Sequence, residues 1–298
     1  MRSEAKWKGH SGSVNSIVFS PDCSHVVSGS FDNTVHIWNV ATGEFEAELK
    51  GHSGNVKTAV FSPDGSHVAS GSDDYTVRIW NVVTGESEAE LKGHSGKVYY
   101  VAFSSDGCHV ASGSDDGTVR IWNVATGESE AELMGHLGRV YSVLFSPDSS
   151  HVVSRSFDNA MHIWNVAMGE SVAEMRGHVN SVVFSLDGNY VASRSFDNTI
   201  HIWNAVTGES EAELIGHSCY VNFIVFSPDG IHVVYRYLDN TIYIWNMDTG
   251  ESAELKGHSG NVFYAIFSLD GSHVYSRSDN STVHIWNVVT RESGAELV

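Results

Sequence analysis

Histidine, serine and aspartate recur together at fixed spacing, and these are the residue types of a nucleophilic hydrolase. In the segment 51–92 they are His52, Ser70 and Asp74. A serine nucleophile needs an exposed position, an oxyanion hole and a single site. Here the set recurs along the whole chain, as expected of a network that satisfies buried polar groups. The sequence therefore predicts no catalytic residues and a protein that is not an enzyme.

Metal and cofactor chemistry is also disfavoured by the spacing of the candidate ligands. The seventeen histidines fall at three positions of the repeat, each used at most once per repeat, which is too dispersed for ligands that must all lie about 2 Å from one ion. Cys23, Cys108 and Cys219 have no metal or disulfide spacing and favour a reducing compartment. Gly96-Lys97 is followed by valine, so no phosphate-binding loop is present. We expect no metal and no cofactor.

The histidine, serine and aspartate residues belong to seven sequence repeats. The pair Gly-His occurs with steps of 42, 42, 42, 42, 39 and 41 residues, and each unit carries one tryptophan in the phrase Ile-Trp-Asn. The units begin near residues 9, 51, 93, 135, 177, 216 and 257, and their tryptophans are Trp38, Trp80, Trp122, Trp164, Trp203, Trp245 and Trp286. This period is typical of an all-β propeller with four-stranded antiparallel blades. Residues 1–298 are therefore predicted to form a single seven-bladed domain.

The second unit illustrates the four strands expected in each blade. Alternating apolar residues and turn signals predict strands over 56–62, 67–72, 76–81 and 86–92. One such sheet cannot bury both of its faces, whereas several sheets stacked face to face can. We call the side that carries the connections between the second and third strands, and between one blade and the next, the upper face.

The chain is strongly acidic, with a formal net charge of −19. Much of this charge lies on the expected outer strands, where Glu86, Glu88 and Glu90 would share one face. Carboxylates on an edge strand discourage aggregation, and the alternative is a docking surface for basic partners. Either arrangement repels nucleic acid. The sequence has no secretory signal and no long apolar run, so we expect a cytoplasmic protein without membrane contact.

The repeated phrase Gly-His-Ser-Gly-Asn-Val, followed by Phe-Ser-Pro-Asp-Gly and by Thr-Val-Arg-Ile-Trp-Asn, resembles the WD40-repeat family over the whole chain, with Asn81 in place of the usual aspartate. The resemblance implies that His52, Ser70, Asp74 and Trp80 form a structural hydrogen-bond tetrad. It also implies that the upper face binds partners. The near-identity of the units further resembles the amplified WD40 arrays on fungal NACHT-type signalling NTPases.

Differences between the units gather at the upper ends of the first two strands. Aromatic residues at such positions anchor peptides well, and the alternative is that they pack between neighbouring blades. A second difference follows the strand-two serine, where the first three units have glycine and the last four have arginine; these arginines form either interblade ion pairs or an anion-binding arc. The predicted partner-binding residues are Tyr99, Tyr100, Tyr141, Phe157, Phe196, Tyr220, Phe223, Phe263, Tyr264, Arg155, Arg194, Arg236 and Arg277.

Together these features predict a non-enzymatic scaffold or sensor that binds a protein or peptide. The alternative is a self-association module, because the chain has seven sets of three inner strands but eight outer-strand segments. We expect residues 4–8 to supply the outer strand of the last blade. Arg291 replaces a turn glycine and Gly294 replaces a mid-strand glutamate in the competing C-terminal segment, and both changes weaken it.

Overall fold

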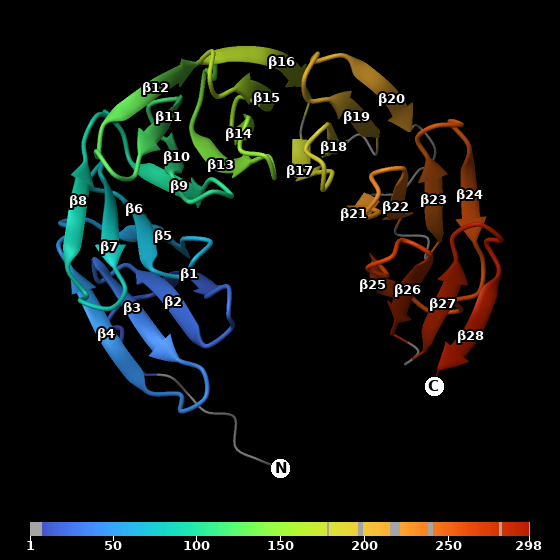
Figure 1. Ribbon diagram of the computed structural model, residues 1–298, viewed down its shortest axis with the longest axis horizontal. Coiled ribbons are helices and arrows are strands. Elements are labelled where there is room, and N and C mark those ends of the chain that lie inside the picture. The colour runs from blue at the N-terminus through green and yellow to red at the C-terminus, as the bar shows by residue number, and fades with distance from the viewer. Residues whose placement is uncertain are drawn as a thin grey trace. The chain divides into compact units, whose positions relative to one another are not determined.

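Apolar alternation and regular turn residues produce four short strands in every repeat. The computed structural model describes residues 8–177, 179–195, 199–214, 221–237, 241–279 and 282–297. These contain 28 strands in seven antiparallel sheets, each with its four strands in chain order (Figure 1). The predicted fold of seven four-stranded blades is confirmed. None of the described residues forms a helix of the kind that crosses a membrane.

The blades follow one another along the chain. The strands of the first four blades are β1 (Val14–Phe19), β2 (His25–Ser30), β3 (Thr34–Asn39), β4 (Phe45–Lys50), β5 (Val56–Phe61), β6 (His67–Ser72), β7 (Val77–Asn81), β8 (Ser87–Leu91), β9 (Val98–Phe103), β10 (His109–Ser114), β11 (Thr118–Asn123), β12 (Ser129–Met134), β13 (Val140–Phe145), β14 (His151–Ser156), β15 (Ala160–Asn165) and β16 (Glu170–Arg176). Those of the last three are β17 (Val179–Phe184), β18 (Tyr190–Ser195), β19 (Ile200–Asn204), β20 (Ser210–Leu214), β21 (Val221–Phe226), β22 (His232–Tyr237), β23 (Ile242–Asn246), β24 (Ser252–Leu255), β25 (Val262–Phe267), β26 (His273–Ser278), β27 (Val283–Asn287) and β28 (Ser293–Leu297).

The chain divides into two compact units, residues 1–174 and residues 175–298. Unit 1 contains the first three blades and most of the fourth. Within it, β1, β5, β9 and β13 lie side by side along the inner edge of the stacked sheets, and β4, β8 and β12 form the outer edge (Figure 1). Unit 2 contains the last three blades, with β17, β21 and β25 as neighbouring inner strands. The single seven-bladed domain stays a prediction.

The hydrophobic core of unit 1 lies between consecutive blades. The face of the first blade that carries Val27, Val35 and Ile37 packs against a face of the second blade that includes Val56 and Trp80. Equivalent clusters join the second blade to the third and the third to the fourth. Because each sheet buries its second face only against the next sheet, burial of apolar area couples the stability of neighbouring blades.

The glycine after the strand-two serine sets how closely blades approach in unit 1. A Cβ atom built on Gly71 would lie 2.7 Å from Cγ1 of Val98 in the next blade, and Gly29 and Gly113 meet Val56 and Val140 at 2.7 and 2.6 Å. In unit 2 the same position is Arg194 and Arg236. There β18 and β22 contact the inner strand of the next blade much less extensively than β2 and β6 do in unit 1. The change from glycine to arginine therefore accompanies looser packing between blades.

The outer strand of the last blade comes from the C-terminal segment, so the prediction for residues 4–8 was wrong. β28 pairs with β27 from Val283 opposite Leu297 to Trp286 opposite Ser293. Arg291 does adopt the left-handed conformation, with a φ of 63°. Its cost of about 1 kcal/mol is smaller than the advantage of closing a short hairpin over recruiting a distant strand. Residues 1–7 lie outside the described part of the chain.

The glycine contact leads to a test of interblade packing. We expect Gly71→Ala to destabilise the protein by about 1–3 kcal/mol, because the added methyl group overpacks the contact with Val98. Urea denaturation measures the change. The double variant Gly71→Ala/Val98→Ala should lower the free energy of unfolding by less than the sum of the two single changes. The Val98→Ala change removes the Cγ1 methyl group that the new Cβ atom at position 71 would contact. Strictly additive costs would contradict this explanation.

The closing hairpin leads to a second test. Deleting residues 290–298 should lower the melting temperature by several degrees, because it exposes the edge of β27 and removes a paired strand. Deleting residues 1–8 serves as the comparison and should have a smaller effect. Differential scanning calorimetry measures both, and the reverse ranking would show that the N-terminal segment stabilises a blade after all.

Candidate functional site

A hydrogen-bond network fixes the upper end of the second blade. His52 contacts Asp74 through Nδ1 at 2.8 Å and Ser70 through Nε2 at 2.7 Å, and the Trp80 indole donates to Ser70 at 2.8 Å. Burial opposes ionisation of Asp74, but hydrogen bonds from His52 and Thr76 outweigh it and hold the pKa of this carboxyl well below its ordinary value. Ser70 is fully buried. This serine is therefore enclosed within the blade, unlike a nucleophile that must meet a substrate.

The same network recurs in the first, third and fourth blades. Histidine bonds aspartate at 2.9, 2.9 and 3.0 Å, and serine accepts from tryptophan at 2.8, 2.7 and 2.7 Å. A threonine hydroxyl, from Thr34, Thr76 or Thr118, also donates to the aspartate in the first three blades. Sequence reasoning missed this fifth member, although the threonine recurs two residues after the aspartate.

The network changes in two blades of unit 2. In the sixth blade Tyr235 replaces the serine; it is buried, its hydroxyl contacts Ser252 at 2.9 Å, and its ring stacks on Tyr243. In the seventh blade His258 contacts Thr282 at 3.1 Å and Ser276 at 2.7 Å. Asn280, which stands at the aspartate position, lies outside the described residues. We expect these two blades to be locally less stable, because each lost buried hydrogen bond costs about 1 kcal/mol.

A β-bulge displays the variable residues of the first strand. In the second blade Val56 pairs with Ser72 and Thr58 pairs with Gly71, so Lys57 is the extra residue. The same shift places Tyr99, Tyr141 and Phe263 at the bulge of the third, fourth and seventh blades. A bulge re-aims one side chain without disturbing the ladder beyond it. Variation at this position therefore changes the surface and leaves the blade intact.

Aromatic rings and cations alternate across the upper face of the third and fourth blades. The Arg139 guanidinium lies 4.2 Å from the Tyr99 ring centre and 5.5 Å from that of Phe157, and its Nε donates to Asp115 at 2.7 Å. Phe157 contacts Tyr141 at 5.1 Å, and the Arg155 guanidinium lies 5.2 Å from the Tyr141 ring. We call Tyr99, Asp115, Arg139, Tyr141, Arg155 and Phe157 the upper cluster. Each cation–π pair contributes about 0.5–1 kcal/mol at such exposure.

Lysines extend this surface toward the first blade. Lys57 lies 4.7 Å from the Phe31 ring centre and 5.8 Å from that of Tyr99. Lys57 and Lys97 contact the same Asp73 oxygen at 3.1 and 3.6 Å. On the upper face of unit 1, ion pairs and cation–π contacts thus join side chains of neighbouring blades. These contacts fix the side-chain positions before any ligand binds.

The other predicted site residues differ in location and in exposure to solvent. Phe263 is 56 % exposed at the upper end of β25, and Phe223 and Tyr264 lie together in unit 2 with ring centres 6.4 Å apart. Phe196 and Tyr220 lie outside the described residues. The four arginines do not share one environment: Arg155 and Arg194 are half-buried, Arg236 is 3 % exposed and Arg277 is exposed. A binding role for these residues stays a prediction.

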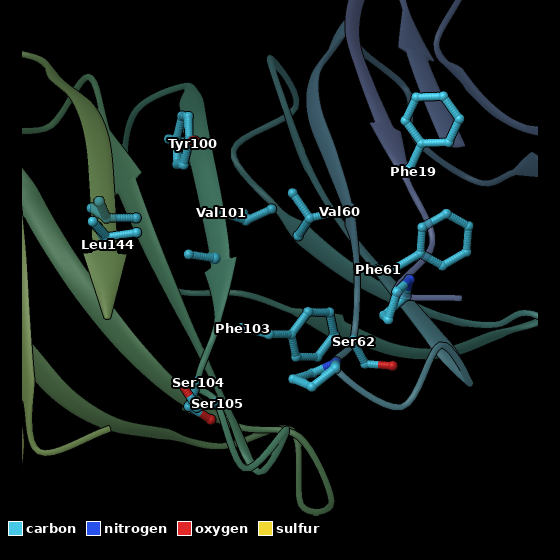
Figure 2. Close-up of a pocket in the computed structure, with 14 residues that line it drawn as sticks. Phe19, Val60, Phe61, Ser62, Tyr100, Val101, Phe103, Ser104, Ser105 and Leu144 are labelled. Atoms are coloured by element: carbon cyan, nitrogen blue, oxygen red, sulfur yellow. The ribbon is translucent and has the colours of Figure 1, made fainter. Parts of the chain in front are cut away.

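Tyr100 faces a different surface from its neighbour Tyr99. It lines a cavity of about 430 Å³ formed by the inner strands of unit 1. Figure 2 shows Phe19, Phe61 and Phe103 from three of these strands around the cavity, together with Tyr100 of β9. The cavity is lined mainly by apolar side chains, and Leu144 on β13 closes its far side. The β-bulge at Tyr99 re-aims this side chain relative to Tyr100, which separates the two tyrosines.

The glutamates of the outer strand are paired within their own blade. In the second blade Glu88 accepts from His67 and Asn81, each at 2.9 Å, and Glu90 contacts Arg78 at 3.1 Å. In the third blade Glu130 and Glu132 make the equivalent contacts. These carboxylates therefore stabilise the outer strands and also give them a negative charge.

Sequence reasoning missed Arg139, Lys57 and Lys97. Arg139 and Lys97 stand directly before the first-strand valine, where other units have serine, asparagine, histidine or tyrosine. Comparing the units one residue further toward the N-terminus would have revealed this position. In the described ranges, no group of histidine, cysteine or acidic side chains has the geometry of a metal site. Cys23 and Cys108 are exposed free thiols; Cys219 is not among the described residues.

Comparison with known proteins agrees with this architecture. A family model for the first β-propeller of IFT122 matches residues 60–297, and a model for the WD domain, G-beta repeat, matches residues 1–39. The chain belongs to the WD40 β-propeller family. Proteins of this family typically serve as non-enzymatic scaffolds for protein–protein interaction, whereas the resemblance to NACHT-associated arrays stays a prediction.

The individual relatives match over short segments. Protein HIRA of Zea mays is 51 % identical over 37 residues, which are 12 % of this chain and 4 % of that protein. Ribosome assembly protein 4 of Saccharomyces cerevisiae is 44 % identical over 41 residues, 14 % of this chain and 8 % of that protein. Among solved structures, the computationally designed Ika8 protein is similar, with a TM-score of 0.69 and 29 % identity over 97 % of this chain and 88 % of that one.

One histidine of the first blade occupies a position where the next two blades have arginine. The position is Arg78 in the second blade and Arg120 in the third, which contact Glu90 and Glu132 at 3.1 and 2.8 Å. His36 is 3 % exposed, stacks on His10 at 3.7 Å, and keeps its Nε2 3.8 Å from the Glu48 carboxylate. Burial and the nearby His10 lower the pKa of His36, against the smaller opposing effects of Asp32 and Glu48.

This arrangement predicts acid sensitivity in the first blade. Because the folded-state pKa is lowered, stability is fully present above pH 6.5 and is lost as the pH falls below 6.5 toward the folded-state pKa. The loss is about 1 kcal/mol per pH unit. His36→Arg should reduce this dependence by pairing with Glu48, and Arg78→His should increase it. Urea denaturation at pH 7.5 and 5.5 measures both variants; unchanged slopes would contradict the assignment.

Proposed function

We propose that this protein is a scaffold or sensor module that binds a protein or peptide through the upper cluster of unit 1. The observation that carries the proposal is a set of aromatic side chains held by cations on an exposed surface. Phe157 is 65 % exposed although its ring contacts Arg139 and Tyr141. Aromatic and arginine side chains are the residue types that dominate binding hot spots.

Pre-organisation supports the same function. The cation–π contacts and the ion pair between Arg139 and Asp115 fix side chains that would otherwise lose rotamer freedom on binding. The role of WD40 propellers in protein–protein interaction supports a protein partner rather than a small substrate. We place the protein in the cytoplasm, since exposed free thiols such as Cys23 favour a reducing compartment. The acidic charge disfavours nucleic acid as a ligand.

A second candidate function is self-association. Within unit 1, Val14, Ile17 and Phe19 of the first blade are more than half exposed. Their counterparts in the second blade, Val56, Ala59 and Phe61, are buried against the first blade. An apolar sheet face of this kind favours contact with a further blade, and a second copy of the chain could supply that blade. Light scattering at rising protein concentration would detect it.

Phe157→Ala tests the primary proposal. Peptides selected from a random display library on the wild-type protein should bind the variant about 30-fold more weakly, a loss of about 2 kcal/mol. Val83→Ala is the matched control, because Val83 is an exposed apolar residue on the lower side of unit 1. Fluorescence polarisation with the selected peptides measures both. Equal loss in the two variants, or failure to select any peptide, would exclude the upper cluster as the binding site.

A further inference from the structure

We infer that Arg139 recognises a carboxylate, so that the upper cluster takes an acidic peptide segment that carries a large apolar side chain beside an aspartate or glutamate. This inference rests on the proposed function and names the chemistry of its partner. It starts from the way in which one guanidinium is held at the surface.

The Arg139 side chain is fixed through only part of its guanidinium. Its Nε donates to Asp115 Oδ1 at 2.7 Å, and its plane lies against the rings of Tyr99 and Phe157. Neither Nη atom has a hydrogen-bond partner among the residues that the structure describes. The side chain remains 37 % exposed. The two remaining donor groups are therefore positioned and available to a ligand.

A planar fork of this kind matches a carboxylate, which is the anionic side-chain group of an unmodified peptide. Two parallel N–H groups can donate to both carboxylate oxygens, and the fixed fork loses little entropy on binding. The neighbouring apolar side chains define the second element of the ligand. Phe157 is largely exposed beside Arg139, and Leu137, two residues before it, is 84 % exposed. An aromatic or long aliphatic side chain would pack there.

The charge of the surrounding surface agrees with an acidic partner. Lys57 and Lys97 share the single carboxylate of Asp73. The tetrad carboxylates of Asp116 and Asp158 lie close by, but both are about nine-tenths buried and accept hydrogen bonds from histidine and backbone groups. In a chain of net charge −19, the four side chains of Lys57, Lys97, Arg139 and Arg155 are a local concentration of cations. Such a patch steers acidic ligands toward it.

The test selects peptides from a randomised dodecapeptide display library on the full chain and on two variants. Arg139→Gln removes the charge, and Arg139→Lys keeps the charge but removes the fork. Lys92→Gln is the control, because Lys92 is an exposed cation that contacts Glu90 in the outer strand. Melting curves verify that each variant is folded. Labelled peptides, their Asp/Glu-to-Asn/Gln versions and phosphoserine versions are then compared by fluorescence polarisation.

We expect wild-type protein to select sequences enriched in aspartate or glutamate next to an aromatic or aliphatic residue. Neutralising the acidic residues should weaken binding at least tenfold on wild type and on Lys92→Gln, and by less than twofold on Arg139→Gln. Arg139→Lys should fall between. Selected peptides without acidic enrichment, or an unchanged preference in Arg139→Gln, would overturn the inference while leaving the binding function intact. A clear preference for phosphoserine would also overturn it, and failure to select any peptide would contradict the proposed function itself.

Discussion

The upper surface of each intact repeat depends on one buried serine hydroxyl. In the second blade Ser70 joins His52 from the connection that enters the blade to Trp80 on the third strand, and His52 holds Asp74 in the turn between. Two connections that are far apart in sequence are thereby fixed to the same sheet. Without this link, the side chain of the bulge residue Lys57 would have no fixed orientation. The same holds for the side chain of Asp73, which precedes Asp74.

This constraint explains why the surface can vary while the fold stays constant. The tetrad and the interblade valines occupy positions where a change disturbs buried contacts, as the contact between Gly71 and Val98 illustrates. Lys57, Tyr99 and Tyr141 occupy the bulge, where the backbone is held but the side chain faces outward. Different residues at one repeat position therefore meet across blade boundaries and form a surface that no single blade contains.

Much of the fold could be predicted because its determinants are local. The second-blade strands expected over 56–62 and 67–72 are Val56–Phe61 and His67–Ser72 in the structure, since apolar alternation and turn residues fix them within the repeat. The partners of Arg139 could not be predicted in this way, because Tyr99 and Asp115 belong to the preceding blade. The closing strand was predicted wrongly. Arg291 has the strained left-handed conformation that was expected, but the free-energy benefit of closing a short hairpin exceeds this strain.

The central claim is that a tetrad-held surface in unit 1 presents Arg139 and Phe157 to an acidic, partly apolar peptide. The most direct test is a crystal structure of the protein bound to a peptide selected on it. The account predicts a peptide carboxylate about 3 Å from the Arg139 Nη atoms and an apolar side chain packed on Phe157. A peptide seated in the inner-strand cavity beside Phe61 and Phe103, or along the glutamates of the outer strands, would contradict it.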